Sequence, residues 1–230
     1  ASFDRVQALT AMALAPDRRC VAICERWAGA TAGAKATAKV RIFHLPRRRT
    51  AVTLSAPVDG DFVGCCFSAD GKFLVAHTCG ADGEPSSTAA VWQWAEERLL
   101  GLLKVKAPLA RVRFKPGDAS LLSYNPPMRL VRLNDSGHMS EVDVLAFKGL
   151  AVADHLWLGA NRLVLATADG EYHVFDDLRA SQTVRGGDAA PSCLCAFAGG
   201  FLAGCDDGRV LVFRRQPVKV PDSGTAKKKK

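Results

Sequence analysis

The sequence lacks the short motifs of several large functional classes. It contains no G-x-S-x-G, H-E-x-x-H or P-loop pattern, so the local signatures of α/β-hydrolases, zinc metalloproteases and P-loop enzymes are absent. No apolar run approaches the ~20 residues of a membrane span, and residues 1–6 do not have the pattern of a signal peptide. Aromatic residues are only 7% of the chain and do not alternate with Lys and Arg, which disfavours a nucleic-acid surface.

Cysteine and histidine do not occur at metal-binding spacings. The eight cysteines include no C-x-x-C pair, and most lie in apolar runs where cysteine packs as a small hydrophobe. Cys193 and Cys195 point to one face of a strand, and we expect packing between sheets to hide both thiols. The histidines are isolated from one another: His44, His77, His138, His155 and His173. We therefore expect reduced thiols, structural histidines and no cofactor.

Positive charge is in excess but is concentrated at one end of the chain. With 31 Lys and Arg against 23 Asp and Glu, the net charge is +8, and Lys227 to Lys230 supply four of these charges. A terminal run of like charges is typical of a solvated tail. We predict that residues 216–230 form a basic tail or linker.

A repeated turn motif is the strongest signal in the sequence. Residues 167–175 (Thr-Ala-Asp-Gly-Glu-Tyr-His-Val-Phe) match residues 205–213 (Cys-Asp-Asp-Gly-Arg-Val-Leu-Val-Phe), and the two Asp-Gly pairs are 38 residues apart. Asp-Gly between two apolar runs indicates a β-hairpin, since glycine tolerates the positive φ of a tight turn. Each copy follows another apolar run, so each unit contains a strand, a turn and a second strand.

A second marker extends the repeat toward the N-terminus. Residues 13–19, 66–72 and 113–119 each place a Pro/Ala-Asp-Gly type of turn after an apolar strand end, at intervals of 53 and 47 residues. The alternation is mostly of period two, with no sustained helical period. Units of about 40–45 residues with four strands each are typical of propeller blades. An ordinary β-sandwich is the alternative, but it does not predict the shared turn chemistry at matching places.

The fold class we predict is an all-β, WD40-type β-propeller with about four and a half blades visible. Residues 6–215 form the blades, at about 6–54, 61–105, 109–144, 150–184 and 192–215. Five blades with the last incomplete would close poorly, because terminal blades need a neighbour to cover their faces. We therefore expect these blades to be part of a larger ring.

The order of features resembles the first propeller of the cilia- and flagella-associated protein 57 family, although the Trp-Asp pair of WD repeats is degenerate here. An Ala/Gly-rich insert at residues 28–38 and the lysine-rich end depart from that pattern. The resemblance implies two propellers followed by a coiled coil, docking on doublet microtubules, help in placing inner dynein arms, and no catalytic residues. It is carried by Leu9–Arg19, Asp61–Leu74, Val91–Trp94, Val112–Pro116 and Gly208–Phe213.

A candidate partner-binding face follows from the blade arrangement. In an antiparallel blade, the loops joining strands one to two and three to four lie on one face of the disc. We predict that this basic face binds an acidic partner such as tubulin or a dynein-associated chain, the alternative being an ordinary solvated surface. Glu96 and Glu97 interrupt the basic face, and the other face collects Asp59, Asp61, Asp82, Glu84, Asp169, Asp206 and Asp207. The candidate binding residues are Arg18, Arg19, Arg47, Arg48, Arg49, Lys72 and Lys115, with Arg214 and Arg215 nearby.

The propeller pattern predicts a non-enzymatic scaffold, and the resemblance implies that it belongs to the axoneme of the motile cilium or flagellum. We expect its partners to be other axonemal proteins and the remainder of its own propeller, with no membrane and no nucleic acid. A generic cytosolic WD-repeat scaffold is the alternative. An enzyme is disfavoured because no polar residues converge in a recognisable constellation.

Overall fold

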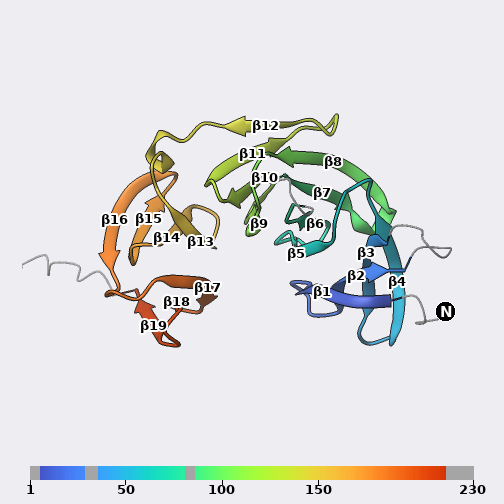
Figure 1. The fold of residues 1–230 in the computed structure, drawn as a ribbon, viewed down its shortest axis with the longest axis horizontal. Coiled ribbons are helices and arrows are strands. Elements are labelled where there is room, and N and C mark those ends of the chain that lie inside the picture. The colour runs from blue at the N-terminus through green and yellow to red at the C-terminus, as the bar shows by residue number, and fades with distance from the viewer. Residues whose placement is uncertain (1–5, 29–35, 81–85, 216–230) are drawn as a thin grey trace, which may run out of the picture.

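The structure, a computed structural model, describes residues 6–28, 36–80 and 86–215. Within these residues the chain forms five antiparallel sheets, each made of consecutive strands. The sheets stand side by side around an open arc, with the first strand of each sheet facing the middle of the arc (Figure 1). This is a β-propeller arrangement, so the sheets are called blades 1 to 5 in chain order. The predicted basic tail or linker, residues 216–230, lies outside the described residues, as do Asp82 and Glu84.

Blades 1 and 2 have four strands each. Blade 1 consists of β1 (Val6–Leu14), β2 (Cys20–Trp27), β3 (Thr37–His44) and β4 (Arg49–Ser55). Blade 2 consists of β5 (Phe62–Phe67), β6 (Phe73–Thr78), β7 (Ser87–Gln93) and β8 (Arg98–Val105), with the short 3₁₀ helix η2 (Trp94–Glu96) before its last strand.

Blades 3 and 4 repeat this order, and blade 5 is shorter. Blade 3 consists of β9 (Arg111–Lys115), β10 (Asp118–Asn125), β11 (Arg129–Leu133) and β12 (Met139–Val142), followed by η3 (Leu145–Phe147). Blade 4 consists of β13 (Val152–Leu158), β14 (Arg162–Thr167), β15 (Glu171–Asp176) and β16 (Arg179–Arg185). Blade 5 contains β17 (Pro191–Phe197), β18 (Gly200–Cys205) and β19 (Val210–Arg214), so three strands of this blade are described.

The Asp-Gly turns form as the sequence predicts. Gly170 and Gly208 have φ of 82° and 84°, in the region that favours glycine. The Gly170 N–H donates to the Thr167 carbonyl at 3.0 Å, and the Thr167 hydroxyl donates to the Asp169 carboxylate at 2.5 Å. The side chain of the aspartate therefore helps to hold the turn that connects β14 to β15.

The core is divided among the four junctions between neighbouring blades. Each junction has its own cluster of buried side chains, to which both of its blades contribute. The second strands of blades 2, 3 and 4 are deeply buried, because neighbouring blades cover both of their faces; Leu163, Val164 and Leu165 of β14 are all 0% exposed. Such strands have continuous apolar runs rather than alternation.

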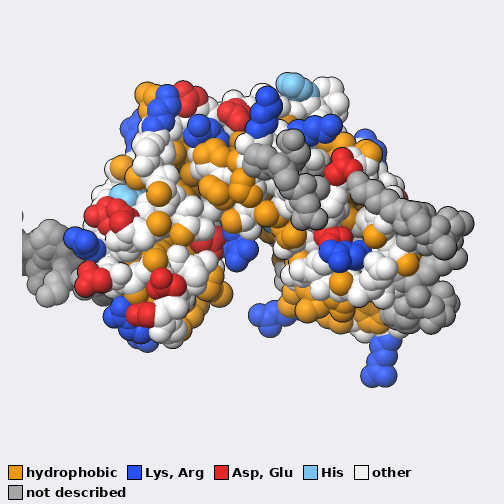
Figure 2. Space-filling view, in the orientation of Figure 1, with side chains coloured by type: hydrophobic (Ala, Val, Ile, Leu, Met, Phe, Trp, Pro, Cys, Tyr) orange, Lys and Arg blue, Asp and Glu red, His pale blue; other side chains and the backbone are white. Residues whose placement is uncertain are grey.

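The two ends of the arc have no blade against them among the described residues. On blade 1, Leu9, Met12 and Leu14 are 62%, 68% and 54% exposed, and on blade 5, Val210 and Val212 are 62% and 55% exposed. Figure 2 shows the opening between blades 1 and 5, with hydrophobic side chains along the blade 1 side of it. Exposed apolar faces of this kind are typical of interaction surfaces.

The expectation that sheet packing hides Cys193 and Cys195 is wrong. Both cysteines are exposed. They are in register with Gly204 and Leu202, and through these with Val210 and Val212 of β19. Paired residues share one face of a sheet, so both thiols lie on the uncovered face of blade 5.

Candidate functional site: the turn face

The antiparallel strand order places the first-to-second and third-to-fourth strand turns of every blade at one side of the arc, here called the turn face. Every candidate binding residue lies on it. In blade 1 this face consists of residues 15–19 and 45–49. In the other blades it consists of residues 68–72 and 94–98, 115–118 and 134–138, 159–162 and 176–179, and 198–199 with 214–215.

The two turns of blade 1 are joined to one another by a backbone hydrogen bond. The Leu45 N–H donates to the Arg19 carbonyl at 2.8 Å, which brings the two turns side by side. Each turn is also closed internally: the Arg19 N–H donates to Asp17 at 2.9 Å, and the Arg47 N–H donates to His44 Nδ1 at 3.2 Å. The result is a compact surface, here called the arginine turns, made of Arg18, Arg19, Arg47, Arg48 and Arg49, all exposed.

The excess positive charge of the turn face belongs to blade 1. The arginine turns hold five basic residues against one acidic residue, Asp17, whereas the turns of the other four blades hold seven basic and seven acidic residues. Sequence reasoning listed the basic residues but left out most aspartates of the same turns. Two of the predicted binding residues, Lys72 and Lys115, have such an aspartate as a neighbour. The Lys72 N–H donates to Asp70 at 3.1 Å, and Lys115 lies beside Asp118.

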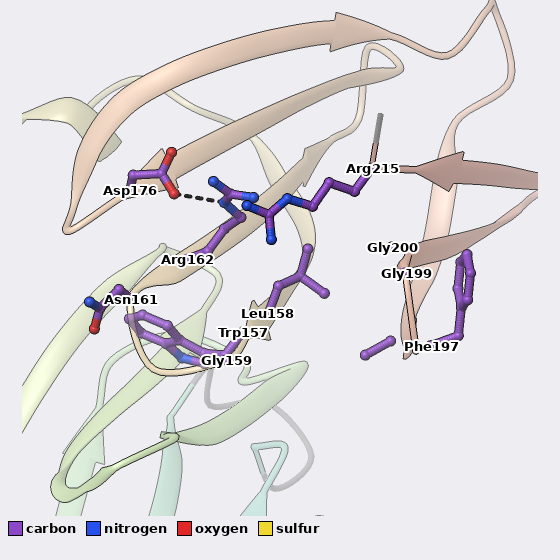
Figure 3. A pocket seen from close by; sticks show the side chains of 11 residues that line it. Trp157, Leu158, Gly159, Asn161, Arg162, Asp176, Phe197, Gly199, Gly200 and Arg215 are labelled. Carbon is purple, nitrogen blue, oxygen red and sulfur yellow. Dashed lines mark hydrogen bonds and ion pairs between the residues drawn. The ribbon is translucent and has the colours of Figure 1, made fainter. Parts of the chain in front are cut away.

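A hollow of about 440 Å³ opens between blades 4 and 5 on the turn face. Figure 3 shows Leu158 below the guanidinium groups of Arg162 and Arg215, with Phe197 on the opposite side. Arg162 Nε donates to Asp176 at 2.6 Å. This hydrogen bond is the main cause that holds the pKa of Asp176 below its usual value, and the charge of Arg215 acts in the same direction.

A second hollow of about 330 Å³ lies between blades 2 and 3. Its arginine, Arg98, donates to Gln93 at 2.6 Å and lies 3.8 Å from Glu96. The positive charge of Arg98 is therefore balanced within blade 2.

A buried polar cluster joins blade 3 to blade 4. His155 Nε2 lies 2.8 Å from the Ser123 hydroxyl, and His155 Nδ1 lies 2.8 Å from the Asn125 side-chain oxygen. The Trp157 indole N–H also donates to Ser123, at 2.9 Å. Ser123, Asn125 and His155 are 0% exposed, so no substrate in solvent reaches this serine and histidine. Burial, followed by the charges of Arg113 and Arg111, holds the pKa of His155 well below its usual range.

Asp154 extends this cluster to blade 5. One carboxylate oxygen accepts from the His155 N–H at 2.8 Å, and the other accepts from the Leu194 N–H of β17 at 2.7 Å. Arg113 of β9 is 3.5 Å away. Through these contacts Asp154 links three consecutive blades. It is 1% exposed, so the link is buried. Sequence reasoning did not identify this residue.

In residues 6–28, 36–80 and 86–215, no three His, Cys, Asp or Glu side chains are grouped so that they could hold a metal ion. Over the same residues, no helix is long and apolar enough to cross a membrane.

Comparison with solved structures places the chain in the class of WD40-type β-propellers. The β-propeller domain of Cps50 (Swd1) from Myceliophteria thermophila superposes with a TM-score of 0.73 at 11% identity, covering 96% of this chain and 70% of that one. The structure of U3-55K superposes with a TM-score of 0.65 at 15% identity, covering 91% of this chain and 61% of that one. At these identities the likeness establishes the fold.

A curated relative gives a more particular comparison. The chain is 22% identical over 183 residues to cilia- and flagella-associated protein 57 of Mus musculus. The match covers 76% of this chain but 14% of the relative, so the chain spans about a seventh of that protein's length. No family model matches the chain.

Proposed function

We propose that this propeller is a non-enzymatic scaffold of the motile-cilium axoneme that docks protein partners, such as inner dynein arm components, on doublet microtubules. The observation that carries the proposal is the similarity to cilia- and flagella-associated protein 57, which extends over 183 residues at 22% identity. The propeller fold supports a scaffold, since its blades present many turns to partners from one rigid frame. A generic cytosolic scaffold is the alternative.

The arginine turns are the docking surface in this proposal. All five arginines are exposed, and among the described residues none has a carboxylate within ion-pair distance. Five exposed arginines against one carboxylate, Asp17, on two adjoining turns favour an acidic surface such as tubulin, with electrostatics guiding orientation and association rate. Lys72 and Lys115 belong to the same face but lie beside acidic groups, so they contribute less.

The test is the location and salt sensitivity of the tagged full-length protein in a ciliated cell. We expect retention on demembranated axonemes and release as ionic strength rises, because salt screens exposed charges. Substitution of Arg47, Arg48 and Arg49 by Ala should lower the salt concentration needed for release. The matched control removes three exposed charges elsewhere, at Lys104, Lys106 and Arg185.

Two outcomes would contradict the proposal at different levels. A diffuse cytoplasmic signal without an axonemal fraction would remove the ciliary assignment and favour the cytosolic scaffold. Axonemal retention with equal salt sensitivity in the arginine variant and its control would keep the assignment and remove the arginine turns as the docking surface.

The proposal also includes the remainder of the ring. Residues 6–215 act as blades, residues 216–230 as a tail or linker, and blades beyond this sequence cover the two exposed end faces. The uncovered side chains of blades 1 and 5 support this, as do the 70% and 61% coverages of the two solved propellers. Thiol labelling tests it in the native full-length protein. Cys193 and Cys195 should react far more slowly with iodoacetamide than the exposed Cys79, and equal rates would show that the blade 5 face is open.

A further inference from the structure

The hollow between blades 4 and 5, here called the blade 4/5 groove, combines an apolar wall with an arginine, Arg215, whose guanidinium pairs with no carboxylate of the described residues. Its wall is formed by Trp157 and Leu158 at the end of β13 and by Phe197 at the end of β17. Trp157 is 6% exposed, and its indole N–H is held by Ser123 in the interior. Phe197 is 38% exposed, so part of its ring is open to a ligand in the hollow.

The backbone around the groove is fixed by close packing. Gly200 lies against β19, and a Cβ atom at this position would be 1.8 Å from the Phe213 carbonyl oxygen, so only glycine fits. The Arg215 N–H donates to the Gly199 carbonyl at 2.8 Å, which fixes the backbone of Arg215 at the rim. The groove is therefore preformed, with Leu158, Phe197 and Arg215 on a fixed backbone.

The charge of the groove is incomplete. Arg162 and Arg215 extend toward one another over the hollow (Figure 3), and Asp176 is the carboxylate that lines it. Asp176 is bound by Arg162 at 2.6 Å. In the part of the chain that the structure describes, the Arg215 guanidinium has no hydrogen-bond or ion-pair partner. Two guanidinium groups thus share one carboxylate, which leaves one positive charge beside an apolar wall.

The hollow between blades 2 and 3 lacks this combination of an apolar wall and an uncompensated arginine, so the combination is not a general property of the propeller fold. There Arg98 is matched by Gln93 and Glu96, and Asp135 also lines the hollow. A ligand carboxylate would have no unpaired arginine to bind at that place.

We propose that the blade 4/5 groove binds a short acidic peptide of a protein partner. One aliphatic or aromatic side chain of the peptide lies against Leu158 and Phe197, and a neighbouring carboxylate binds the guanidinium of Arg215. An apolar anchor beside a charge-assisted hydrogen bond is the combination that carries most of the affinity in small protein interfaces. This site lies on blades 4 and 5, so it is separate from the arginine turns of blade 1.

Fluorescence anisotropy with a set of fluorescein-labelled peptides tests the proposal on the native full-length protein. The probes are Glu-Glu-Leu-Glu-Glu, Glu-Glu-Phe-Glu-Glu and Glu-Glu-Ser-Glu-Glu, which have the same charge and differ in the anchor. We expect the Leu or Phe peptide to bind about tenfold more tightly than the Ser peptide. Equal affinities, or no binding by either apolar peptide, would overturn the proposal.

Two variants and one control locate the binding. Arg215→Ala should weaken the apolar peptides about five- to tenfold, and Phe197→Ser should reduce their affinity to that of the Ser peptide. Arg214→Ala is the matched control, since Arg214 is the adjacent exposed arginine and does not line the groove. If Arg214→Ala weakens binding as much as Arg215→Ala, the peptides respond to general charge, and the groove is not their site. The comparison of peptides uses the unmodified protein, so it is independent of any effect of the variants on folding.

Discussion

The junction between blades 1 and 2 and the junction between blades 3 and 4 are held together by different forces. The buried core of the first is apolar: Ile42 and Cys24 of blade 1 pack with Phe62 and Trp92 of blade 2, and the two aromatic rings meet edge to face at 5.8 Å. The side-chain hydrogen bonds that cross it, from the Thr10 hydroxyl to the Phe62 carbonyl and from Trp92 Nε1 to the Ser55 carbonyl, are only partly buried. The second adds a buried polar cluster to its apolar residues, and Asp154 extends that cluster to blade 5.

Neighbouring blades are aligned in different ways at the two junctions. Apolar packing is non-directional and depends on volume, so it holds two blades together without demanding one exact alignment. Buried hydrogen bonds are directional, and a partner lost from them leaves an unpaired group at a cost of about 1–3 kcal/mol. Blades 3 to 5 are therefore fixed in register by their polar groups, and the two junctions should respond to different perturbations.

The largest effect is expected from Asp154→Ala. The substitution leaves the Leu194 N–H without its acceptor and the Arg113 guanidinium without its buried counter-charge. We expect a loss of about 3–5 kcal/mol in the free energy of unfolding, measured with chemical denaturant. The control is Asp143→Ala, whose side chain is 75% exposed in its pair with Lys148 and should change stability by less than about 1 kcal/mol. Similar losses for both variants would show that Asp154 does not join the blades.

Acid should weaken the junctions of blade 3 with blades 2 and 4, because each holds a buried histidine near Arg111 of blade 3: His77 of β6 and His155 of β13. Burial lowers the pKa of His77 to about 4, whereas its value in an unfolded chain is about 6.5. The neutral ring therefore contributes stability that is fully present above pH 6.5 and is lost as the pH falls toward 4. We expect His77 alone to account for a loss of about 2 kcal/mol at pH 5, with His155 acting in the same direction. Denaturant midpoints that are equal at pH 7.5 and pH 5 would contradict this.

Ser123→Ala tests the polar cluster without removing a charge. The serine hydroxyl is the shared partner of His155 and of the Trp157 indole, and both are buried. We expect the free energy of unfolding to fall by about 1–3 kcal/mol. Ser136→Ala, in an exposed turn, is the control and should change it by about 0.5 kcal/mol or less. The prediction fails if the two variants are equally stable.

The smallest effect is expected in the apolar junction. Ile42 is 0% exposed, and Ile42→Val removes one methylene from its cluster. We expect a loss of about 0.5–1.5 kcal/mol, with the same dependence on pH as the unmodified protein. Measurement of the denaturant midpoint at pH 7.5 and pH 5 for both proteins checks this, and a changed pH dependence would mean that the two junctions are not independent.

Features that depend on neighbouring residues could be predicted from the sequence. The Asp-Gly turn at residues 169–170 is an example, because its glycine conformation and its aspartate hydrogen bond lie within four residues. Repetition of such turns at blade spacing led to the propeller. The role of Asp154 could not be predicted in this way, since its partners Arg113 and Leu194 are 41 and 40 residues distant. Each pairing exists only after two blades have packed.

Only part of the candidate turn face could be predicted from the sequence, because only some of its contacts are between neighbouring residues. Arg47, Arg48 and Arg49 are consecutive, so their common turn is visible in the sequence. That the basic excess of the turn face belongs to blade 1 depends on which aspartates share the turns of the other blades. The blade 4/5 groove is formed by Leu158, Phe197 and Arg215, which no sequence motif connects.

The position of the arginine turns has a mechanical consequence. They lie at one end of the arc, far from its middle, so an approaching anionic polymer exerts a torque on the molecule as well as an attraction. The propeller would turn during the encounter until the arginine turns face the polymer, so blade 1 would make the first contact.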